Sequence, residues 1–365
     1  MAVPELLNEN EAAVAADVHR VGPSKTRSIL TGLALLVVGV VVVVVGLKAM
    51  THTTAFVRVP VVLVGLAGIY KGLDVLVKHR FGSRFDTGLW LCLGWLILVV
   101  GAAVFADILP LAEHQDTTKT IRDPLYARPD LISSHPLGTN RFSLDLLARV
   151  IYGARVSLLT ALLAVVLSLI VGMTIGVLAG YYRGWGDQVI GVITDALLSF
   201  PPLLLLVAVG AVIGKPKTPT ESVVKVGIAL AIVSVPTMLR IARANTLVYA
   251  QREFVVAARA MGAKNLRIVV RELFPNVLLP LVSYAFIIVA ALIMAEGSLG
   301  FLGLGLQQPK PTWGNMIAEG REIDVLRKHP HVVFVPATVM FLTVFSFNRV
   351  GEKARQLWDP RDVKV

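Results

Sequence analysis

The amino-acid sequence predicts an all-α protein that crosses a membrane several times. Hydrophobic residues make up 55% of the 365-residue chain and charged residues only 16%, and the mean hydropathy is +0.73. Uncharged stretches of about 20 residues recur, and that length of helix crosses the ~30 Å hydrocarbon core of a bilayer. Strand-like alternation of polar and apolar residues is not sustained anywhere in the sequence. These observations exclude a water-soluble globular protein and predict about eight spanning helices.

Eight apolar windows define the predicted helices. Six uncharged windows are long enough to span: 28–47, 87–106, 156–182, 196–214, 273–295 and 329–348. Two shorter windows, 59–70 and 226–239, have basic residues at both ends. Long basic side chains at a helix end can reach the interface, so both windows are expected to span as well.

These windows divide the chain into segments. Residues 1–27 hold four acids and no small-residue cleavage site after a short apolar core, so we expect a cytosolic tail and not a cleaved signal peptide. An N-terminal helical hairpin is predicted over 28–78. The other segments are predicted as a helix over 87–109, an extracytoplasmic loop over 110–147, a helical core over 148–350 and a cytosolic tail over 351–365.

Basic residues predict the orientation of the chain. With the N-terminus inside and eight spans, 20 of the 35 Lys and Arg residues lie in five inner segments: 1–27, 71–86, 183–187, 240–272 and 349–365. The others lie mostly in the long loops 107–155 and 296–328, where the positive-inside rule has little force. If only one of the first two windows spanned, every later loop would change sides. We therefore expect both windows to span or neither.

Several classes of function are excluded. The net charge of +11 does not indicate nucleic-acid binding, because the basic residues lie between apolar runs and no aromatic residues are interleaved with them. Cys92 is the only cysteine, so an intrachain disulfide or cysteine metal site is excluded. The histidines lack His-Glu-x-x-His spacing, and Ser24-Lys25-Thr26 lacks the glycines of a phosphate-binding loop. A transporter of this sequence would take its energy from a partner or from a gradient.

Residues 252–276 form a basic segment between two apolar windows. The basic residues are Arg252, Arg259, Lys264, Arg267 and Arg271, and Leu266, Val269, Val270 and Leu273 are expected on one helical face. We predict a short helix over 253–261, a left-handed residue at Gly262, and a second helix capped by Asn265 and ending at Pro275. Such a hairpin fits either a helix pair lying on anionic lipid or a rigid element that docks into a cytosolic partner.

A glycine-rich stretch follows the window 273–295. Its glycines are Gly297, Gly300, Gly303 and Gly305. Each makes a helix less stable by about 1 kcal/mol relative to alanine, so irregular backbone is expected here. Irregular backbone at membrane depth occurs where it is buried in protein or borders a water-filled cavity, and a plain extracellular turn is the alternative.

The segment 252–276 resembles the cytoplasmic coupling loop of binding-protein-dependent ABC importer permeases, which has the pattern Glu-Ala-Ala, three residues, Gly, nine residues and Ile-x-Leu-Pro. Four residues match this pattern: Ala257, Ala258, Gly262 and Pro275. Three differ from it: Val256, Glu272 and Phe274. The resemblance implies that the ATPase-coupling residues are Glu253, Ala257, Ala258, Arg259, Gly262, Ala263 and Pro275.

Four further segments, 135–159, 195–206, 295–317 and 359–362, resemble the dipeptide and oligopeptide permease group, second permease subunit type. The resemblance covers about 85–362 and leaves out 1–78. Ser143 and Leu144 stand where the group usually has a Gly-Arg pair. The external motif consists of His135, Pro136, Leu137, Gly138, Thr139 and Asp145. The outer vestibule or pathway would include Glu296, Gly300, Phe301, Gly303 and Gly305.

Two acids lie in or beside the predicted spans. Asp195 interrupts an apolar run, and an acid near the centre of a span costs ~3 kcal/mol to insert. We expect Asp195 to face protein or water, or to lie at the interface before the Pro201-Pro202 bend. Glu296 matches a common acid of the group and is expected to contact substrate, a second permease, or neither.

The resemblance implies the six-helix ABC importer permease fold with an extra N-terminal helix pair, in the inner or plasma membrane with both termini cytosolic. It implies a transport subunit that moves di- or oligopeptides and holds no cofactor. Its partners would be a second homologous permease, two cytosolic ATPases that bind ATP and Mg, and an extracytoplasmic solute-binding protein docked over 107–155 and 296–328. Nickel chelates or oligosaccharides are alternative substrates. A gradient-driven secondary transporter would need inverted repeats and mid-membrane charges, and a membrane-embedded enzyme would need clustered acids or histidines.

Overall fold

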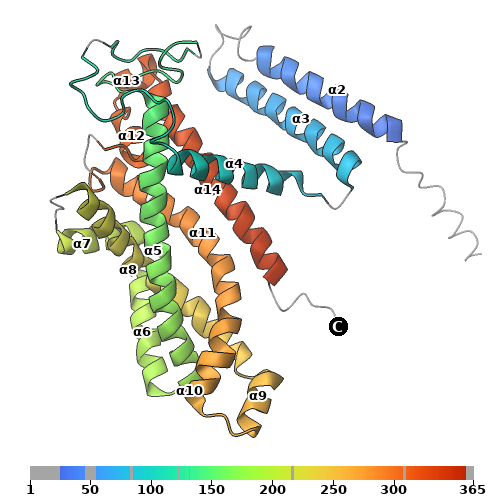
Figure 1. The fold of residues 1–365 in the computed structure, drawn as a ribbon, viewed down its shortest axis with the longest axis vertical. Coiled ribbons are helices and arrows are strands. Elements are labelled where there is room, and N and C mark those ends of the chain that lie inside the picture. Colours follow the sequence, from blue (N-terminus) through green and yellow to red (C-terminus); the bar gives the residue numbers. More distant parts are fainter. Residues whose placement is uncertain are drawn as a thin grey trace, which may run out of the picture. The chain divides into compact units, whose positions relative to one another are not determined.

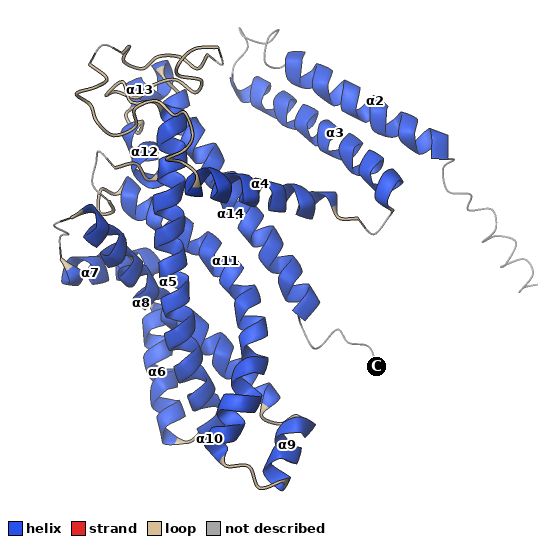
Figure 2. Ribbon diagram, viewed as in Figure 1, coloured by secondary structure: helices blue, strands red, loops and turns tan. Residues whose placement is uncertain are grey.

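The computed structural model describes residues 25–45, 55–82, 85–121, 123–130, 132–214, 218–306 and 310–358. These residues form helices joined by loops (Figure 2). Their only β contact is an isolated bridge between Thr139 and Asp145. Within the described part, six helices are long and apolar enough to cross a membrane, or seven if a bent pair counts as one span. A shorter apolar helix covers Ile29–Val44. The prediction of an all-helical, membrane-spanning fold is confirmed.

The first of two compact units, Met1–Leu91, contains a pair of packed helices, α2 (Lys25–Val44) and α3 (Ala55–Phe81) (Figure 1). A methyl group added to Gly39 would lie 2.6 Å from the Ile69 backbone nitrogen, and one added to Gly72 would lie 2.7 Å from that of Leu36. The two backbones therefore approach closely, as small residues allow between helices in lipid. α3 is longer than the predicted window 59–70 because it continues through the basic residues at its C-terminal end, among them Lys78.

The second unit, Cys92–Val365, contains the remaining spans. α4 (Thr87–Val104) enters this unit at Cys92. The other spans are α5 (Leu146–Tyr182), α8 (Pro219–Tyr249), α11 (Phe274–Phe301) and α14 (His331–Trp358). α5 packs along α8, and α11 packs against both α5 and α14. A core cluster includes Ala161, Leu230, Met238 and Ile293. α4 is tied to this unit by hydrogen bonds, including that from Trp95 Nε1 to Thr343 Oγ1 at 3.1 Å.

Polar caps extend two helices beyond their predicted windows. α5 begins at Leu146 and not at 156, because Asp145 Oδ2 accepts a hydrogen bond from the Ala148 N–H at 2.7 Å. α8 begins at Pro219 and not at 226, after a capping box in which Thr218 Oγ1 accepts from the Glu221 N–H at 3.2 Å. The basic residues at the ends of the predicted window 226–239 form ion pairs, such as that between Lys225 and Glu221.

The bend expected at Pro201-Pro202 is present, so the apolar window 196–214 is not one continuous helix. The segment is divided between α6 (Trp185–Ser199) and α7 (Pro202–Ile213), which are bent by 102°. Phe200 and Pro201 have extended backbones, with ψ of 139° and 126°. Consecutive prolines remove backbone donors and disfavour helical geometry in the preceding residue, so the helix cannot continue through them.

Close approach of α5 to α8 at Gly176 yields the first testable prediction. A methyl group there would lie 2.6 Å from the Leu239 carbonyl oxygen and 2.7 Å from Ala242 Cβ. We expect Gly176→Leu to destabilise the folded protein by about 1–3 kcal/mol through overpacking. Thermal unfolding of the purified protein measures this loss. Gly191→Leu on α6 is the matched control, because no atom lies within 4 Å of its added methyl; equal effects of the two substitutions would contradict the packing argument.

Candidate functional site

The segment 252–276 forms a hairpin at the end of the helical core, with α9 (Glu253–Ala260) and α10 (Asn265–Arg267) on either side of a tight turn (Figure 1). Gly262 has a φ of +82°, as predicted for a left-handed residue. The Ala263 N–H donates to the Ala258 carbonyl and the Gly262 N–H to the Arg259 carbonyl, both at 3.0 Å. This Schellman pattern ends α9 and fixes the turn.

The second arm of the hairpin differs from its prediction. α10 passes into a π-helical segment, Ile268–Leu273, and then into α11, so it does not end at Pro275. Pro275 occupies the first turn of α11, where a missing N–H costs little. Asn265 is not the cap, because Lys264 holds that position. Asn265 Oδ1 instead accepts a hydrogen bond from the Tyr181 hydroxyl at 2.9 Å.

The inner side of the hairpin is packed into the core. Its buried residues are Val255, Ala258, Ile268, Val269 and Leu273, which form a cluster with Met173, Val177, Ala242, Val277 and Leu281 of α5, α8 and α11. The hairpin is therefore fixed to three long helices. The prediction of one apolar face is wrong, because Val269 and Leu273 are buried whereas Leu266 and Val270 are exposed. The wider π-helical turn changes the direction of successive side chains.

The outer side of the hairpin combines exposed apolar and basic groups. Val256, Met261, Leu266 and Val270 are all more than half exposed. The five predicted basic residues are exposed as well. Of the predicted coupling residues, Glu253, Ala257, Arg259 and Gly262 face outward, Ala258 faces inward, Ala263 is half-buried, and Pro275 lies beyond the π-helical segment. This surface suits docking to a partner more than solvation alone.

The external motif lies at the start of α5. His135 Nδ1 lies 3.1 Å from Asp145 Oδ1, and the Leu146 N–H donates to the Gly138 carbonyl at 3.0 Å. Thr139 forms the bridge to Asp145, while Leu137 packs against Leu146, Val150, Met316 and Val332 and Pro136 is half-buried beside it. The motif residues are therefore brought together as the cap that begins α5.

The structure shows how Ser143 and Leu144 fit at the positions where the resembling group usually has a Gly-Arg pair. Ser143 has a φ of 58°, in the left-handed region where glycine is favoured. Its hydroxyl donates to the Asp123 carbonyl at 2.8 Å, which holds the turn. Leu144 is completely buried. An apolar side chain thus fills the position at which the resembling group has arginine.

A buried charge network lies behind this motif, and the sequence did not reveal it. Arg149 Nη2 lies 2.5 Å from Glu319 Oε1, and Asn140 Nδ2 donates to Glu319 Oε2 at 2.8 Å. Both charged side chains are at most 2% exposed. Arg149 also donates to the His114 carbonyl at 3.2 Å. The network joins the external loop, α5 and α12 (Trp313–Glu319). α12 is far from the other two segments in sequence.

Glu113 organises the external loop next to this network. Its Oε1 accepts hydrogen bonds from the N–H groups of His114, Gln115 and Asp116 at 3.0–3.1 Å. These donors, with Lys119 nearby, lower the pKa of Glu113 to about 2 because they stabilise the carboxylate. The Glu113 carbonyl accepts from the Asp145 N–H at 3.1 Å. The loop is therefore attached directly to the cap of α5.

The glycine-rich stretch is helical further than predicted. α11 continues through Gly297 and Gly300 to Phe301, and only Gly303, with a φ of +77°, and Gly305 lie beyond it. A methyl group on Gly314 of α12 would lie 2.6 Å from the Gly297 Cα. Tertiary packing explains the difference: these glycines let α12 lie against α11, which offsets their low helix propensity.

The two predicted acids lie in different environments. Glu296 is fully buried, and its Oε2 accepts from the Ser157 hydroxyl at 2.8 Å. Asp195 is exposed on α6, where its Oδ1 lies 2.5 Å from Arg240 Nη2 of α8. Asp187 and Arg243 form a second pair between α6 and α8. Asp195 therefore faces a protein cation. The described residues contain no group of three or more His, Cys, Asp or Glu that could hold a metal ion.

Comparison with known proteins identifies the family. The model of the family described as "Binding-protein-dependent transport system inner membrane component" matches residues 172–361. The chain belongs to this family.

Its relatives include two annotated transport permeases. The chain is 37% identical over 267 residues to the glutathione transport system permease protein GsiD of Escherichia coli O157:H7, covering 73% of this chain and 84% of that protein. It is 36% identical over 259 residues to the dipeptide transport system permease protein DppC of Alkalihalophilus pseudofirmus, covering 71% of this chain and 81% of that protein. A solved structure, the MetNI methionine ABC transporter in inward facing conformations, is 19% identical with a TM-score of 0.44, covering 57% of this chain and 97% of that chain.

The buried pair generates the second prediction. Arg149→Met leaves the Glu319 carboxylate buried without its cation, and we expect a loss of about 3–5 kcal/mol in the free energy of unfolding. The double variant Arg149→Met, Glu319→Gln removes that charge and keeps an acceptor for Asn140, so it is expected to recover part of the loss. Thermal unfolding of the purified proteins measures both.

Arg155→Met is the matched control on the same helix. Arg155 pairs with Asp107 on the protein surface, at side-chain exposures of 30% and 67%. Such exposed pairs contribute about 1 kcal/mol or less. Equal destabilisation by Arg149→Met and Arg155→Met would show that the network at Glu319 is not a buried charge pair.

Proposed function

We propose that this chain is the permease subunit of an ATP-driven importer that translocates di- or oligopeptides, glutathione-like peptides included. The relatives GsiD and DppC are named as permeases for glutathione and for dipeptides, and the segments 135–159 and 295–317 support the same group. An extracytoplasmic solute-binding protein would deliver the peptide. The chain itself would carry out no bond chemistry.

The hairpin 252–276 carries the energy-coupling part of this proposal. It is fixed to α5, α8 and α11 by a buried cluster, while its outer side presents apolar and basic groups. A rigid element of this kind can transmit the movement of a partner into the helices behind it. We infer that two cytosolic ATPases, which would bind ATP and Mg, provide that movement, and that the hairpin docks on one of them. With this orientation, both chain termini would lie in the cytosol.

The opposite end of the core would form the outer surface. The loop 107–155 and residues 296–328 would receive the solute-binding protein, and a second homologous permease would complete the path. Phe301, the last residue of α11, and Gly303 just after it are both exposed, which suits a vestibule. Glu296 and Gly300 are buried: Glu296 accepts a hydrogen bond from Ser157 of α5, and Gly300 lies against Gly314 and Asn315 of α12. We therefore propose a positioning role for these two residues.

Alternative substrates and energy sources have less support. Nickel chelates and oligosaccharides are not named among the relatives described above. A gradient-driven secondary transporter would need ionisable groups free to titrate within the spans. The charges of α6 and α8 are instead paired across the two helices.

The third prediction concerns coupling at Gly262. Proline cannot adopt a φ near +82° and would remove the N–H that donates to Arg259. We expect Gly262→Pro to reduce transport by roughly tenfold while ATP hydrolysis by the complex continues, since typical coupling free energies of 1–3 kcal/mol correspond to such changes. Parallel assays of uptake and hydrolysis in proteoliposomes distinguish the two effects.

Gly262→Asn is the control at the same position, because asparagine tolerates left-handed geometry better than other side chains. It should retain most of the transport. Labelling of Lys264 by an impermeant amine reagent checks the orientation. Reaction only from outside the cell, or unimpaired transport by a well-expressed Gly262→Pro protein, would rule out the docking role.

The fourth prediction concerns the substrate. A strain lacking this chain should lose uptake of a di- or oligopeptide, and the purified complex should contain two ATPase subunits and a second permease. Ligand identification on the co-purified solute-binding protein would then return a peptide. Normal peptide uptake together with loss of nickel or sugar uptake would replace the substrate assignment. A complex without any ATPase subunit would refute the importer proposal itself.

A further inference from the structure

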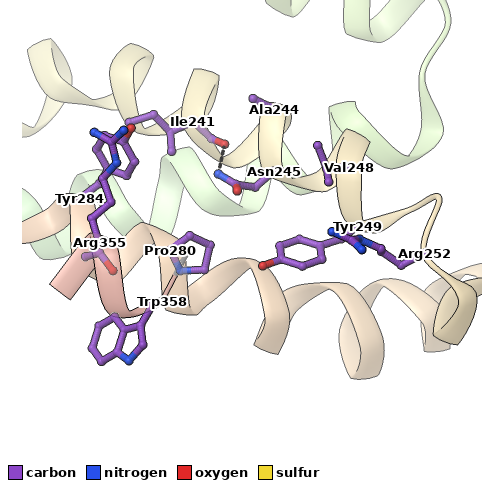
Figure 3. Close-up of a pocket in the computed structure, with 11 residues that line it drawn as sticks. Ile241, Ala244, Asn245, Val248, Tyr249, Arg252, Pro280, Tyr284, Arg355 and Trp358 are labelled. Carbon is purple, nitrogen blue, oxygen red and sulfur yellow. Dashed lines mark hydrogen bonds between the residues drawn. The ribbon is translucent and has the colours of Figure 1, made fainter. Parts of the chain in front are cut away.

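A cavity of 270 Å³ lies between α8, α11 and α14, next to the first residue of the hairpin (Figure 3). Its charged lining residues are Arg252 and Arg355, and its aromatic lining residues are Tyr249, Tyr284 and Trp358. Figure 3 shows Arg355 and Trp358 at one end of the cavity and Tyr249 and Arg252 at the other. Of its lining residues, only Arg252 belongs to the hairpin proposed to dock on an ATPase.

The charge of the cavity is positive and uncompensated by the residues that line it. No acidic residue is among the described residues of the lining. Within the described part of the chain, neither Arg252 nor Arg355 forms an ion pair. The Arg355 guanidinium lies over the Tyr284 ring, 5.3 Å from its centroid. A guanidinium held against an aromatic ring in this way keeps N–H groups available for an anion.

The position of the cavity corresponds to a membrane interface. Tyr249 and Trp358 are the last residues of α8 and α14, and Arg252 caps α9. Tyrosine and tryptophan are typical of the headgroup level of a bilayer, and basic pockets between spanning helices on the cytoplasmic side bind anionic headgroups. The volume is below the roughly 300–1,000 Å³ of drug-sized ligand pockets, which suits a headgroup better than a peptide.

We propose that this cavity binds the phosphate headgroup of an anionic phospholipid of the cytosolic leaflet, with Arg355 and Arg252 as its cationic partners. The acyl chains would extend along the apolar surfaces of the adjacent spans. A lipid in this position connects the end of α14 to the first residue of the hairpin, and so stabilises the corner at which α8 turns into α9. The leaflet rests on the orientation proposed above, whereas headgroup binding does not depend on transport.

Purified full-length protein in nanodiscs of phosphatidylcholine, with or without phosphatidylglycerol, tests this site. Phosphatidylglycerol should raise the melting temperature of the wild-type protein. The double variant Arg252→Gln, Arg355→Gln should lose that increase, with binding of a spin-labelled phosphatidylglycerol weakened by roughly tenfold or more, since each basic group near an anionic surface contributes about fivefold. Lys353→Gln removes the same charge from the same end of α14, outside the cavity lining, and should behave as wild type.

Three results would overturn the proposal. The first is an equal response of the wild-type and double-variant proteins to phosphatidylglycerol. The second is a loss in Lys353→Gln as large as that in the double variant, which would indicate general surface charge. The third is stabilisation of the wild-type protein by inorganic phosphate in phosphatidylcholine nanodiscs, which would indicate a soluble anion. Failure of peptide uptake would affect none of these readings, so the two proposals are tested separately.

Discussion

The close packing of α5 on α8 is the constraint on which the rest of the second unit depends. At Gly172, Gly176 and Gly180 an added methyl group would lie within 3.0 Å of atoms of α8. Helices in lipid gain little from hydrophobic burial against each other, so close van der Waals contact of this kind provides much of their association energy. The hairpin is fixed to one end of this helix pair, and the external network lies at the other end of α5.

α5 connects these surfaces physically. With 37 residues, it is roughly 55 Å long at 1.5 Å per residue. Near one end, Val177 belongs to the cluster that fixes the hairpin, and at the other end Arg149 joins the external loop to Glu319. A stiff helix held at both ends transmits displacement better than one held by surface contacts, since packed interiors have low compressibility. This arrangement is the mechanical basis for the proposed coupling of hairpin movement to the outer face.

Much of the fold could be predicted from the sequence, and the differences have identifiable causes. Apolar length located the spans, and Gly262 was correctly predicted as the left-handed residue of the hairpin. The prediction of one apolar face for the second arm of the hairpin failed because the α-helix there changes to a π-helix. Val269 is therefore buried whereas Leu266 is exposed. Propensity failed at Gly297, because the contact of α12 is made by residues that are distant in sequence. Neither the Arg149–Glu319 pair nor the cavity between Arg252 and Arg355 could be predicted from sequence patterns, because each joins residues that are far apart in the sequence.

The sequence by itself determined that the chain is helical, that it lies in a membrane and that a basic hairpin interrupts its spans, because these properties follow from hydrophobic length and from the position of charges along the chain. The tertiary structure alone decided which side of the hairpin is buried and which charges have partners. These outcomes depend on contacts between segments that are far apart in sequence, such as Arg149 with Glu319. Periodicity along one helix specifies its own faces but not the helix that will cover each of them.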